Sequence, residues 1–466
     1  MDTLAQSRIR ELFENCKKKS VELRISTVRQ RREKLRKLEE WILDHRAEIH
    51  MALYQDLQKP TQETDLTEIF VILQEIRKAR KNLKSWMIPD RVGNSIVFLG
   101  TKAEVYPEAK GACLIISPWN YPFQLAIAPL VSSIAAGNST IIKPSEFSEN
   151  TSILIKKMCA EIFPEDEVGV VLGAVEESKE LLSFSFDHIF FTGSPQVGKL
   201  VMEAASKHLA SVTLELGGKS PTIVDETANI KDAATKISWG KWLNAGQVCI
   251  APDYLLVHEK VKEKLIDELV VQSTKMYGEE KNYAAIISRQ HHNRINDLMA
   301  DAIEKGADLE FGGKSDRDNL RFTPTLLSNV SSNSRIMEEE IFGPILPVIT
   351  FSTLDQALEI VNKKEKALAL YIFSTSNSNI QRVKRETTSG MMAINDTVIQ
   401  FGHPNLPIGG VNNSGIGKAH GYHGFLAFSN QKAVLRQRIG FTMAKTVYAP
   451  FGKIKNLTID FMLKYF

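Results

Sequence analysis

Apolar residues recur every three or four positions through the first part of the chain, from residue 7 to about residue 84. The repeat includes Leu35, Leu38, Trp41 and Ile42, and again Ile69, Ile72 and Ile76. This spacing predicts long amphipathic helices with one apolar face each. The many Lys and Arg residues between them are interpreted as a solvated helix face rather than a binding patch, and no chemistry is assigned to them.

After Gly111 the pattern changes to short apolar runs that alternate with helical windows. The predicted strands are 112–116, 140–142, 168–172 and 188–191, and the predicted helices are 123–136 and 148–162. Alternation of this kind indicates a mostly parallel sheet with helices on both faces. A second α/β stretch runs from about 221 to 395. The predicted fold class is α/β, with a Rossmann-like domain and a second α/β domain.

Two further β-rich segments lie outside this alternation. Residues 95–106 hold Gly100 and Thr101 between two β-rich runs, which predicts a hairpin that projects from the body. A second run covers 427–435. Exposed strand edges pair readily with other chains, so we expect the two segments to form an arm that completes a sheet with a second subunit. The expected assembly is a homodimer.

Composition narrows the class of protein. The 466 residues are 43% hydrophobic and 24% charged, which fits a chain that folds throughout. Lys and Arg number 58 against 55 Asp and Glu, so nucleic acid is not an expected partner. The N-terminus lacks a secretory signal, and the longest apolar stretch, around 124–137, is too short to span a membrane. We expect a soluble, cytoplasmic protein.

Cysteine and histidine spacing gives no sign of a metal site. The four cysteines, Cys16, Cys113, Cys159 and Cys249, show no CxxC or paired spacing, which favours neither zinc nor a disulfide framework. The histidine pairs 291–292 and 420/423 lack a nearby third ligand. No metal is expected.

Two turns at strand ends could bind a dinucleotide. The turn 193–198 follows a predicted strand and opens a helix, where free N–H groups and the helix dipole suit a pyrophosphate. The alternative is an ordinary cap at Ser194 with Pro195 in the first helical turn. Lys143 and Glu146 follow another strand and could bind ribose, or simply begin a helix capped by a nearby serine.

Three residues could do covalent chemistry. Cys249 follows a helical window and is either a nucleophile or a small buried hydrophobic residue. Glu215 stands in an apolar strand, where burial would raise its pKa toward that of a general base, or it pairs with Lys219 at the strand end. Asn120 lies between two prolines and either donates to an oxyanion or closes a turn.

Six motifs in one order resemble the aldehyde dehydrogenase superfamily over most of the chain. They are Pro118-Trp119-Asn120-Tyr121-Pro122, Lys143-Pro144-Ser145-Glu146, Phe191-Thr192-Gly193-Ser194, Glu215-Leu216-Gly217-Gly218-Lys219, Gly246-Gln247-x-Cys249 and Glu340-Ile341-Phe342-Gly343-Pro344. Gly240-Lys241-Trp242, the run 249–254, Asn395-Asp396 and His403 resemble the class 3 branch, which includes fatty and aromatic aldehyde dehydrogenases. Val248 departs from the threonine that many members have before the nucleophile.

The resemblance implies oxidation of an aldehyde to an acid through a thiohemiacetal and a thioester on Cys249, with Asn120 and a backbone N–H holding the oxyanion. Glu215 is the expected base for thioester hydrolysis, and Glu340 is the alternative. The resemblance also implies NAD as cofactor, with NADP possible. The implied cofactor-binding residues are Ser117, Trp119, Lys143, Glu146, Gly193, Ser194, Val197, Gly198, Glu340 and Phe342. Medium- or long-chain aliphatic or aromatic aldehydes are the expected substrates.

Two rivals compete with this interpretation: a CoA-acylating aldehyde dehydrogenase and a catalytically silent structural relative. Glu215 in a hydrolysing position argues against the first, and the presence of both Cys249 and Glu215 argues against the second. The expected domains are an NAD-binding domain at 1–214, with a bridging hairpin at 91–110, and a catalytic domain at 215–405. Residues 406–466 are expected to form the return segment, the bridging strand and a tail.

The tail carries Ile454, Leu457 and Phe461 on one helical face. It could pack on its own subunit, cap the partner's substrate funnel with Phe461, Met462 and Phe466, or lie on a membrane surface. The funnel cap is the favoured hypothesis. Because the sequence ends at Phe466, a spanning segment after the tail is not expected.

Overall fold

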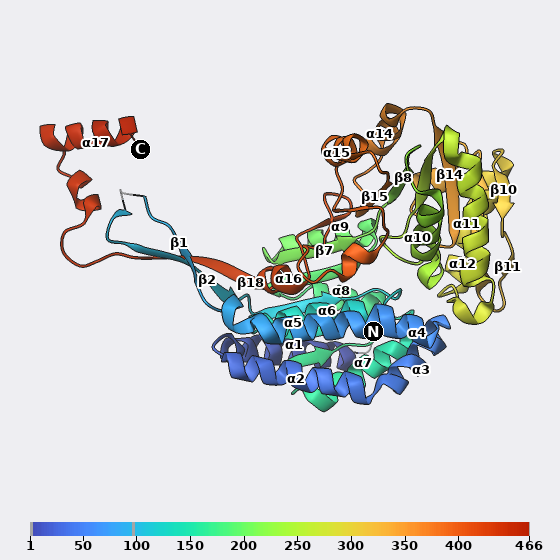
Figure 1. The fold of residues 1–466 in the computed structure, drawn as a ribbon. Coiled ribbons are helices and arrows are strands. Elements are labelled where there is room, and N and C mark those ends of the chain that lie inside the picture. Colours follow the sequence, from blue (N-terminus) through green and yellow to red (C-terminus); the bar gives the residue numbers. More distant parts are fainter. Residues whose placement is uncertain (1–2, 96–97, 466) are drawn as a thin grey trace.

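The computed structural model describes residues 3–95 and 98–465, and its ribbon is drawn in Figure 1. The helices are α1 (Thr3–Arg24), α2 (Val28–Asp44), α3 (Arg46–Leu57), α4 (Thr61–Thr64), α5 (Phe70–Trp86), α6 (Gln124–Ala136), α7 (Glu149–Ile162), α8 (Val175–Leu182), α9 (Pro195–Ser206), α10 (Ile230–Trp242), α11 (Lys262–Tyr277), α12 (Arg289–Glu304), α13 (Arg335–Glu338), α14 (Leu354–Lys363), α15 (Asn377–Glu386), α16 (Gly421–Ala427) and α17 (Lys453–Tyr465). Shorter helical turns are η1 (Asp65–Ile69), η3 (Leu243–Gly246), η4 (Glu259–Val261), η5 (Glu280–Asn282), η6 (Ile399–Gly402) and η7 (Met443–Val447).

The strands are β1 (Asp90–Val92), β2 (Lys102–Ala109), β3 (Ala112–Ile116), β4 (Ser139–Lys143), β5 (Val168–Val170), β6 (His188–Gly193), β7 (Ser211–Leu216), β8 (Pro221–Val224), β9 (Tyr254–His258), β10 (Asp308–Phe311), β11 (Ser315–Asp316), β12 (Arg321–Phe322), β13 (Thr325–Ser328), β14 (Ile345–Phe351), β15 (Ala369–Phe373), β16 (Met391–Ile394), β17 (Gly415–Ile416) and β18 (Ser429–Arg436). Strands and helices alternate through most of the chain. The predicted α/β fold class is confirmed.

The first large sheet has the order β17-β7-β6-β3-β4-β5 within the described residues, and all its pairings except that of β17 with β7 are parallel. From β3 the chain steps outward through β4 and β5, and then returns to add β6 and β7 on the other side. The carboxyl ends of β3 and β6 therefore form a switch point, where open α/β sheets bind ligands.

Apolar side chains alternate between the two faces of this sheet. On β3, Cys113 and Ile115 face a core shared with α6, α7 and the outer helices α2, α3 and α5. Ala112 and Leu114 face a second core shared with α1, α8 and α9. The amphipathic helices predicted for the N-terminal part are confirmed, and α2 to α5 form an extra helical layer on one side (Figure 1).

The second large sheet has the order β10-β13-β14-β9-β8-β15-β16 in the described chain, with an antiparallel pairing of β10 with β13. Its main core packs against α10, α11 and α12. The chain crosses from β7 to this sheet through Gly217–Ser220, and β17 later returns to pair with β7. The domain boundaries proposed from the sequence stay predictions.

A three-stranded arm projects from the body in the order β1-β2-β18 (Figure 1). Its first strand, Asp90–Val92, comes earlier than the predicted hairpin at 95–106, and residues 98–101 form the turn. Residues 96–97 of that hairpin lie outside the described residues. Strand β18 pairs with β2 along its whole length.

Beyond the arm, α17 lies far from both sheets (Figure 1) and has no buried residue among those described. Phe466, which belongs to the predicted lid, lies outside the described residues. In residues 3–95 and 98–465, no helix is long and apolar enough to cross a membrane.

Candidate active site

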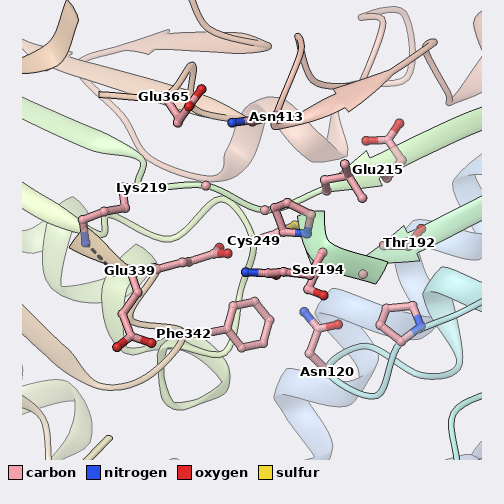
Figure 2. A pocket seen from close by; sticks show the side chains of 18 of the residues that line it. Asn120, Thr192, Ser194, Glu215, Lys219, Cys249, Glu339, Phe342, Glu365 and Asn413 are labelled. Atoms are coloured by element: carbon pink, nitrogen blue, oxygen red, sulfur yellow. Dashed lines mark hydrogen bonds between the residues drawn. The ribbon is translucent and has the colours of Figure 1, made fainter. Parts of the chain in front are cut away.

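A cavity of about 620 Å³ opens at the carboxyl ends of the first sheet, between the two α/β units. Cys249, Glu215 and Asn120 all line it, from three different parts of the sequence (Figure 2). Five predicted cofactor residues also line it: Trp119, Gly193, Ser194, Glu340 and Phe342. The other five lie outside the described lining: Ser117, Lys143, Glu146, Val197 and Gly198.

Cys249 follows a turn with unusual backbone geometry. Asn244, Ala245 and Gly246 have consecutive positive φ angles of 50°, 53° and 72°. A Cβ on Gly246 would lie 2.3 Å from the carbonyl oxygen of Gly343, so only glycine fits there. Non-glycine residues in this conformation are strained, and such strain persists only where the surroundings fix it.

The side chain of Gln247 supplies part of that support. Its amide nitrogen donates to the carbonyl oxygens of Asn244 at 3.0 Å and Ala285 at 2.9 Å. Its amide oxygen accepts the N–H of Ile287 at 3.0 Å. The turn before Cys249 is therefore fixed to the second α/β unit.

The Cys249 thiol differs from the other three in exposure. Cys16, Cys113 and Cys159 are at most 1% exposed, whereas Cys249 is partly exposed to the cavity. The pKa of Cys249 is raised to about 12, mainly by burial of the thiol and to a smaller extent by the nearby carboxyl groups of Glu340 and Glu215. The isolated protein therefore holds a thiol, and a cationic group beside it is needed to favour the thiolate.

Asn120 follows β3 and is 2% exposed. Its side-chain nitrogen donates to the carbonyl oxygen of Gln247 at 3.0 Å. A carboxamide nitrogen carries two hydrogens, so one N–H stays available toward the cavity. The contact with Gln247 shows that Asn120 fixes its loop, and its oxyanion role stays a prediction.

Glu215 lies on β7, opposite Gly415 of β17. Burial raises the pKa of Glu215 to about 8, and the cation of Lys418 opposes that rise. Its Oε1 is buried without a hydrogen-bond partner among the described residues. Lys219 pairs instead with Asp253, so the strand-end pair of Glu215 with Lys219 is not formed.

Glu340 is held closely by the glycines after β7. A Cβ on Gly217 would lie 2.1 Å from Glu340 Oε2, so the carboxyl group packs directly on that backbone. The pKa of Glu340 is raised to about 8, mainly by burial and to a smaller extent by the charge of Asp253. A hydrogen bond from the Gly218 N–H opposes this rise. Arg294 donates to the backbone carbonyl of Glu340 at 3.2 Å.

The turn after β6 caps α9 and also borders the cavity. Ser194 Oγ accepts the N–H of Val197 at 3.4 Å, which matches the capping alternative. A Cβ on Gly198 would lie 2.7 Å from a Leu216 methyl group, so glycine allows α9 to pack closely on β7. The N-terminus of α9, with Ser194, Pro195 and Gln196, lines the cavity, and the dipole of a helix start suits an anion there.

Lys143 ends β4 and Ser117 directly follows β3, at the edge of the sheet where the cavity opens. Lys143 is buried, donates to the Pro144 carbonyl at 2.8 Å and lies 3.7 Å from the partly exposed Glu146. Ser117 Oγ and Thr192 Oγ1 are buried without hydrogen-bond partners among the described residues. These two hydroxyls without a protein partner, together with the N-terminus of α9, fit a polar ligand of dinucleotide size.

Several charged cavity residues were not foreseen from the sequence, because they come from distant segments without a local motif. Lys199 lies on α9, and His291 and Arg294 lie on α12. The His291 ring lies 4.8 Å from that of Trp119, and burial lowers the pKa of His291 to about 4. Lys418 donates to the carbonyl oxygens of Gly409 and Gly410.

A second, small cavity of about 30 Å³ adjoins Cys249 and Glu215 on another side. Its apolar lining comprises Leu125, Ala128, Pro129, Phe190, Leu368, Phe401, Ile408 and Ala419. It also includes Glu75 and His420, which lie 3.5 Å apart. The described residues contain no cluster of three His, Cys, Asp or Glu side chains able to hold a metal ion.

Comparison with known proteins identifies the family. Residues 2–434 match the aldehyde dehydrogenase family. The chain belongs to this family. It is 45% identical to the 4,4'-diaponeurosporen-aldehyde dehydrogenase of Staphylococcus aureus, and the match covers 87% of this chain and 88% of that one. It is also 38% identical to aldehyde dehydrogenase family 3 member A2 of Mus musculus, covering 98% of this chain and 94% of that one.

A solved structure shows the same fold. That of Staphylococcus aureus AldH in a substrate-bound state superposes with a TM-score of 0.93 at 42% identity, covering 98% of this chain and 99% of that chain. The predicted class 3 resemblance is confirmed by this set of relatives. The protein is an enzyme that oxidises aldehydes with NAD(P) as cofactor.

Proposed function

We propose that Cys249 is the nucleophile, that Asn120 stabilises the oxyanion, and that Glu215 is the base that hydrolyses the thioester. The supporting observation is that these three side chains line one cavity although they lie up to 129 residues apart in the sequence. Bound NAD(P)⁺ supplies the acceptor for the hydride that leaves the aldehyde carbon.

In the first half-reaction the Cys249 sulfur attacks the aldehyde carbon and forms a thiohemiacetal. The carbonyl oxygen becomes an oxyanion, which the second N–H of the Asn120 amide and the backbone N–H of Cys249 stabilise. The backbone amides of Cys249 and Ile250 also lower the pKa of the thiol, against the larger effect of burial. Loss of hydride from the carbon then leaves a thioester on Cys249.

In the second half-reaction a water molecule attacks the thioester carbon, and Glu215 takes its proton. The unpartnered Oε1 of Glu215 supports this role, because a base needs a free lone pair for water. Glu340 fits the role less well, because its carboxyl group rests on Gly217 and accepts the Gly218 N–H. Cleavage of the thioester releases the acid and restores the Cys249 thiol.

For the cofactor, we infer that Lys143 and Glu146 bind the adenine ribose, and that Ser117 and Trp119 also contact the dinucleotide. The turn with Gly193, Ser194, Val197 and Gly198 is assigned to the pyrophosphate, and Glu340 and Phe342 to the nicotinamide end. The edge-to-face packing of Phe342 on Trp119, with ring centroids 5.3 Å apart, supports a shared aromatic wall. A carboxylate at Glu146 disfavours a 2′-phosphate, so NAD is the favoured cofactor and NADP a second one.

Medium- or long-chain aliphatic or aromatic aldehydes are the proposed substrates. The apolar side chains that line the second cavity beside Cys249 support this choice, since removal of an apolar chain from water against such side chains is favourable. The similarity to an enzyme named 4,4'-diaponeurosporen-aldehyde dehydrogenase supports it as well.

We also propose a cytoplasmic homodimer formed through the arm. The free edge of β18 supports this, because an unpaired strand edge offers hydrogen bonds to a second chain. The absence of buried residues in the described part of α17 argues against packing of the tail on its own subunit. Of the two remaining roles, the proposed one is a cap over the partner's substrate funnel, with peripheral membrane contact as the alternative.

The test of the proposed nucleophile is Cys249→Ala. Aldehyde-dependent NADH formation should disappear while NAD⁺ still binds, as measured by fluorescence titration. Turnover of this variant at the wild-type rate would exclude the covalent mechanism.

A further inference from the structure

A buried ion pair lies directly beneath the loop that carries Asn120. The Lys59 and Glu68 side chains are both 0% exposed, and Lys59 Nζ lies 2.6 Å from Glu68 Oε1. Neither residue belongs to the described lining of the Cys249 cavity. Apolar residues of the same volume often stabilise a core as well as a buried ion pair does, so stability alone explains this pair poorly.

Both members of the pair bind the backbone of the Asn120 loop. Lys59 Nζ donates to the Asn120 carbonyl oxygen at 3.2 Å. Glu68 Oε2 accepts the N–H groups of Phe123 at 3.1 Å and Gln124 at 2.8 Å. The pair thus holds the loop at two points, at Asn120 and at the start of α6.

The contacts of Glu68 satisfy a helix terminus. The first N–H groups of α6 have no partner within the helix and carry its positive dipole end, so a carboxylate is favoured there. Glu68 lies in the π-helical turn η1, between α4 and α5. A π-turn inserts an extra residue and changes the face on which the following side chains lie, and such turns are frequent at functional sites.

The remaining contacts of Asn120 complete the arrangement. Its carbonyl oxygen also accepts from Asn244 Nδ2 at 2.9 Å, and its own Nδ2 donates to the Gln247 carbonyl at 3.0 Å. With one amide hydrogen committed, the position of the backbone decides where the second one points. Oxyanion stabilisation depends on donors held within a few tenths of an ångström of the developing charge.

We propose that Glu68, with Lys59, is a positioning residue that fixes the Asn120 amide where the oxyanion forms. Glu68 acts through the backbone of residues 120–124. As a pair, Lys59 and Glu68 add no net charge beside the cavity. This inference rests on the proposed oxyanion role of Asn120.

A double-mutant cycle tests the coupling. Glu68→Gln, Asn120→Ala and the double variant are compared by stopped-flow measurement of the first NADH turnover, with saturating NAD⁺ and aldehyde. We expect Asn120→Ala to slow this turnover by roughly 100-fold and Glu68→Gln by roughly tenfold or more. In the Asn120→Ala background, Glu68→Gln should change the rate by less than about twofold, because its effect passes through Asn120.

Two further variants separate positioning from stability. Glu39 of α2 is a buried carboxylate in the same helical layer, paired with Arg77 and Arg80, so Glu39→Gln measures the effect of breaking an ion pair elsewhere. Its first-turnover rate should equal that of the wild type. Where Glu68→Gln folds poorly, Lys59→Met with Glu68→Leu removes both charges together and should slow the first turnover similarly, with unchanged NAD⁺ affinity.

Three outcomes would overturn the inference. Equal slowing by Glu68→Gln in both backgrounds would mean that Glu68 acts independently of Asn120. A wild-type rate in Glu68→Gln would remove the positioning role while leaving that of Asn120 intact. A wild-type rate in Asn120→Ala would instead reject the oxyanion role on which the inference rests.

Discussion

At the scale of single residues, two carboxyl groups near Cys249 both have a raised pKa, but they differ in how many contacts hold them. Burial raises the pKa of both Glu215 and Glu340 to about 8. Glu340 is fixed by close contact with Gly217, whereas Glu215 Oε1 has no hydrogen-bond partner among the described residues. This difference supports the proposal that Glu215 is the base, because an unpartnered carboxyl oxygen can bind water without first breaking a contact.

Lys418 should set the pH at which Glu215 works. A Cβ on Gly409 would contact both Lys418 Cδ, at 3.0 Å, and Glu215 Oε1, at 3.2 Å, so the two side chains flank the same glycine. Removal of the cation in Lys418→Met should raise the pKa of Glu215 further above its value of about 8, so that a smaller fraction of the carboxyl group is ionised at neutral pH. We expect the acidic limb of the pH profile of the deacylation rate to move up by about one pH unit. Deacylation at pH 7 should then be roughly tenfold slower.

Lys418→Arg should keep the wild-type profile because it keeps the charge. Lys384→Met, which removes an exposed cation on α15, is the matched control. An unchanged pH profile of deacylation in Lys418→Met would exclude this electrostatic role.

Cys249 should react slowly without cofactor. Its pKa of about 12 implies little thiolate at neutral pH, while the positive nicotinamide ring of NAD⁺ would favour the thiolate. We expect NAD⁺ to accelerate the alkylation of Cys249 by iodoacetamide. Peptide mass spectrometry measures the rate of this reaction. The other three cysteines are buried and serve as internal controls. Protection from alkylation by NAD⁺ at all pH values would contradict this explanation.

At the scale of elements, the turn η3 precedes Cys249, the proposed nucleophile, and should determine where its side chain lies. Its three positive φ angles are tolerated because Gln247 binds Ala285 and Ile287 across the turn. In Gly246→Ala, a Cβ would collide with the Gly343 carbonyl. We expect more than tenfold loss of kcat and a lower Tm, whereas Gly93→Ala, where a Cβ has no neighbour within 4 Å, should change neither. Wild-type kcat in Gly246→Ala would show that the turn does not control the nucleophile.

Local sequence patterns predict the individual helices and strands better than they predict the contacts between them. The strand predicted at 112–116 matches β3, because its residues are apolar and buried on both faces. The arm strand β1 lies before the hairpin predicted at 95–106, since its three exposed residues carry no apolar alternation, although it overlaps the start of the bridging hairpin predicted at 91–110. Cys249, Glu215 and Asn120 could be proposed because each stands in a family motif.

The sequence did not indicate the functional part of the N-terminal helices. Lys59 falls among the Lys and Arg residues interpreted as a solvated helix face, and Glu68 was given no role, yet both side chains are fully buried. Helical periodicity reports which face of a helix is apolar, but not which polar residue meets a loop more than 50 residues away. Lys418 was missed for the same reason, because its relation to Glu215 depends on the return of β17 to the first sheet.

At the scale of the whole molecule, the arm and the tail lie outside the body that holds the active site. The arm carries α17 well away from its own cavity (Figure 1), so an effect of the tail on catalysis requires a second subunit. Exposed apolar residues continue along this region, with Ile439 and Phe451 more than 60% exposed. Burial of such surface is expected on dimer formation.

Truncation after Ala444 tests the tail. In a dimer whose tail caps the partner's funnel, the ratio of kcat/KM for long-chain over short-chain aldehydes should change several-fold, with NAD⁺ affinity unchanged. An unchanged ratio in a folded truncation would leave the tail with a packing role, and liposome binding by the intact protein would favour membrane contact. Sedimentation of the intact protein as a monomer at micromolar concentration would reject the dimer.

The most direct test of the mechanism is mass spectrometry of Glu215→Gln mixed with NAD⁺ and an aldehyde. Without its base, the enzyme should form NADH once per site and then retain the acyl group as a thioester on the Cys249 peptide. Glu340→Gln should show no such accumulation. Rapid steady turnover by Glu215→Gln with no acyl group on Cys249, together with accumulation in Glu340→Gln, would contradict the assignment of Glu215 as the base.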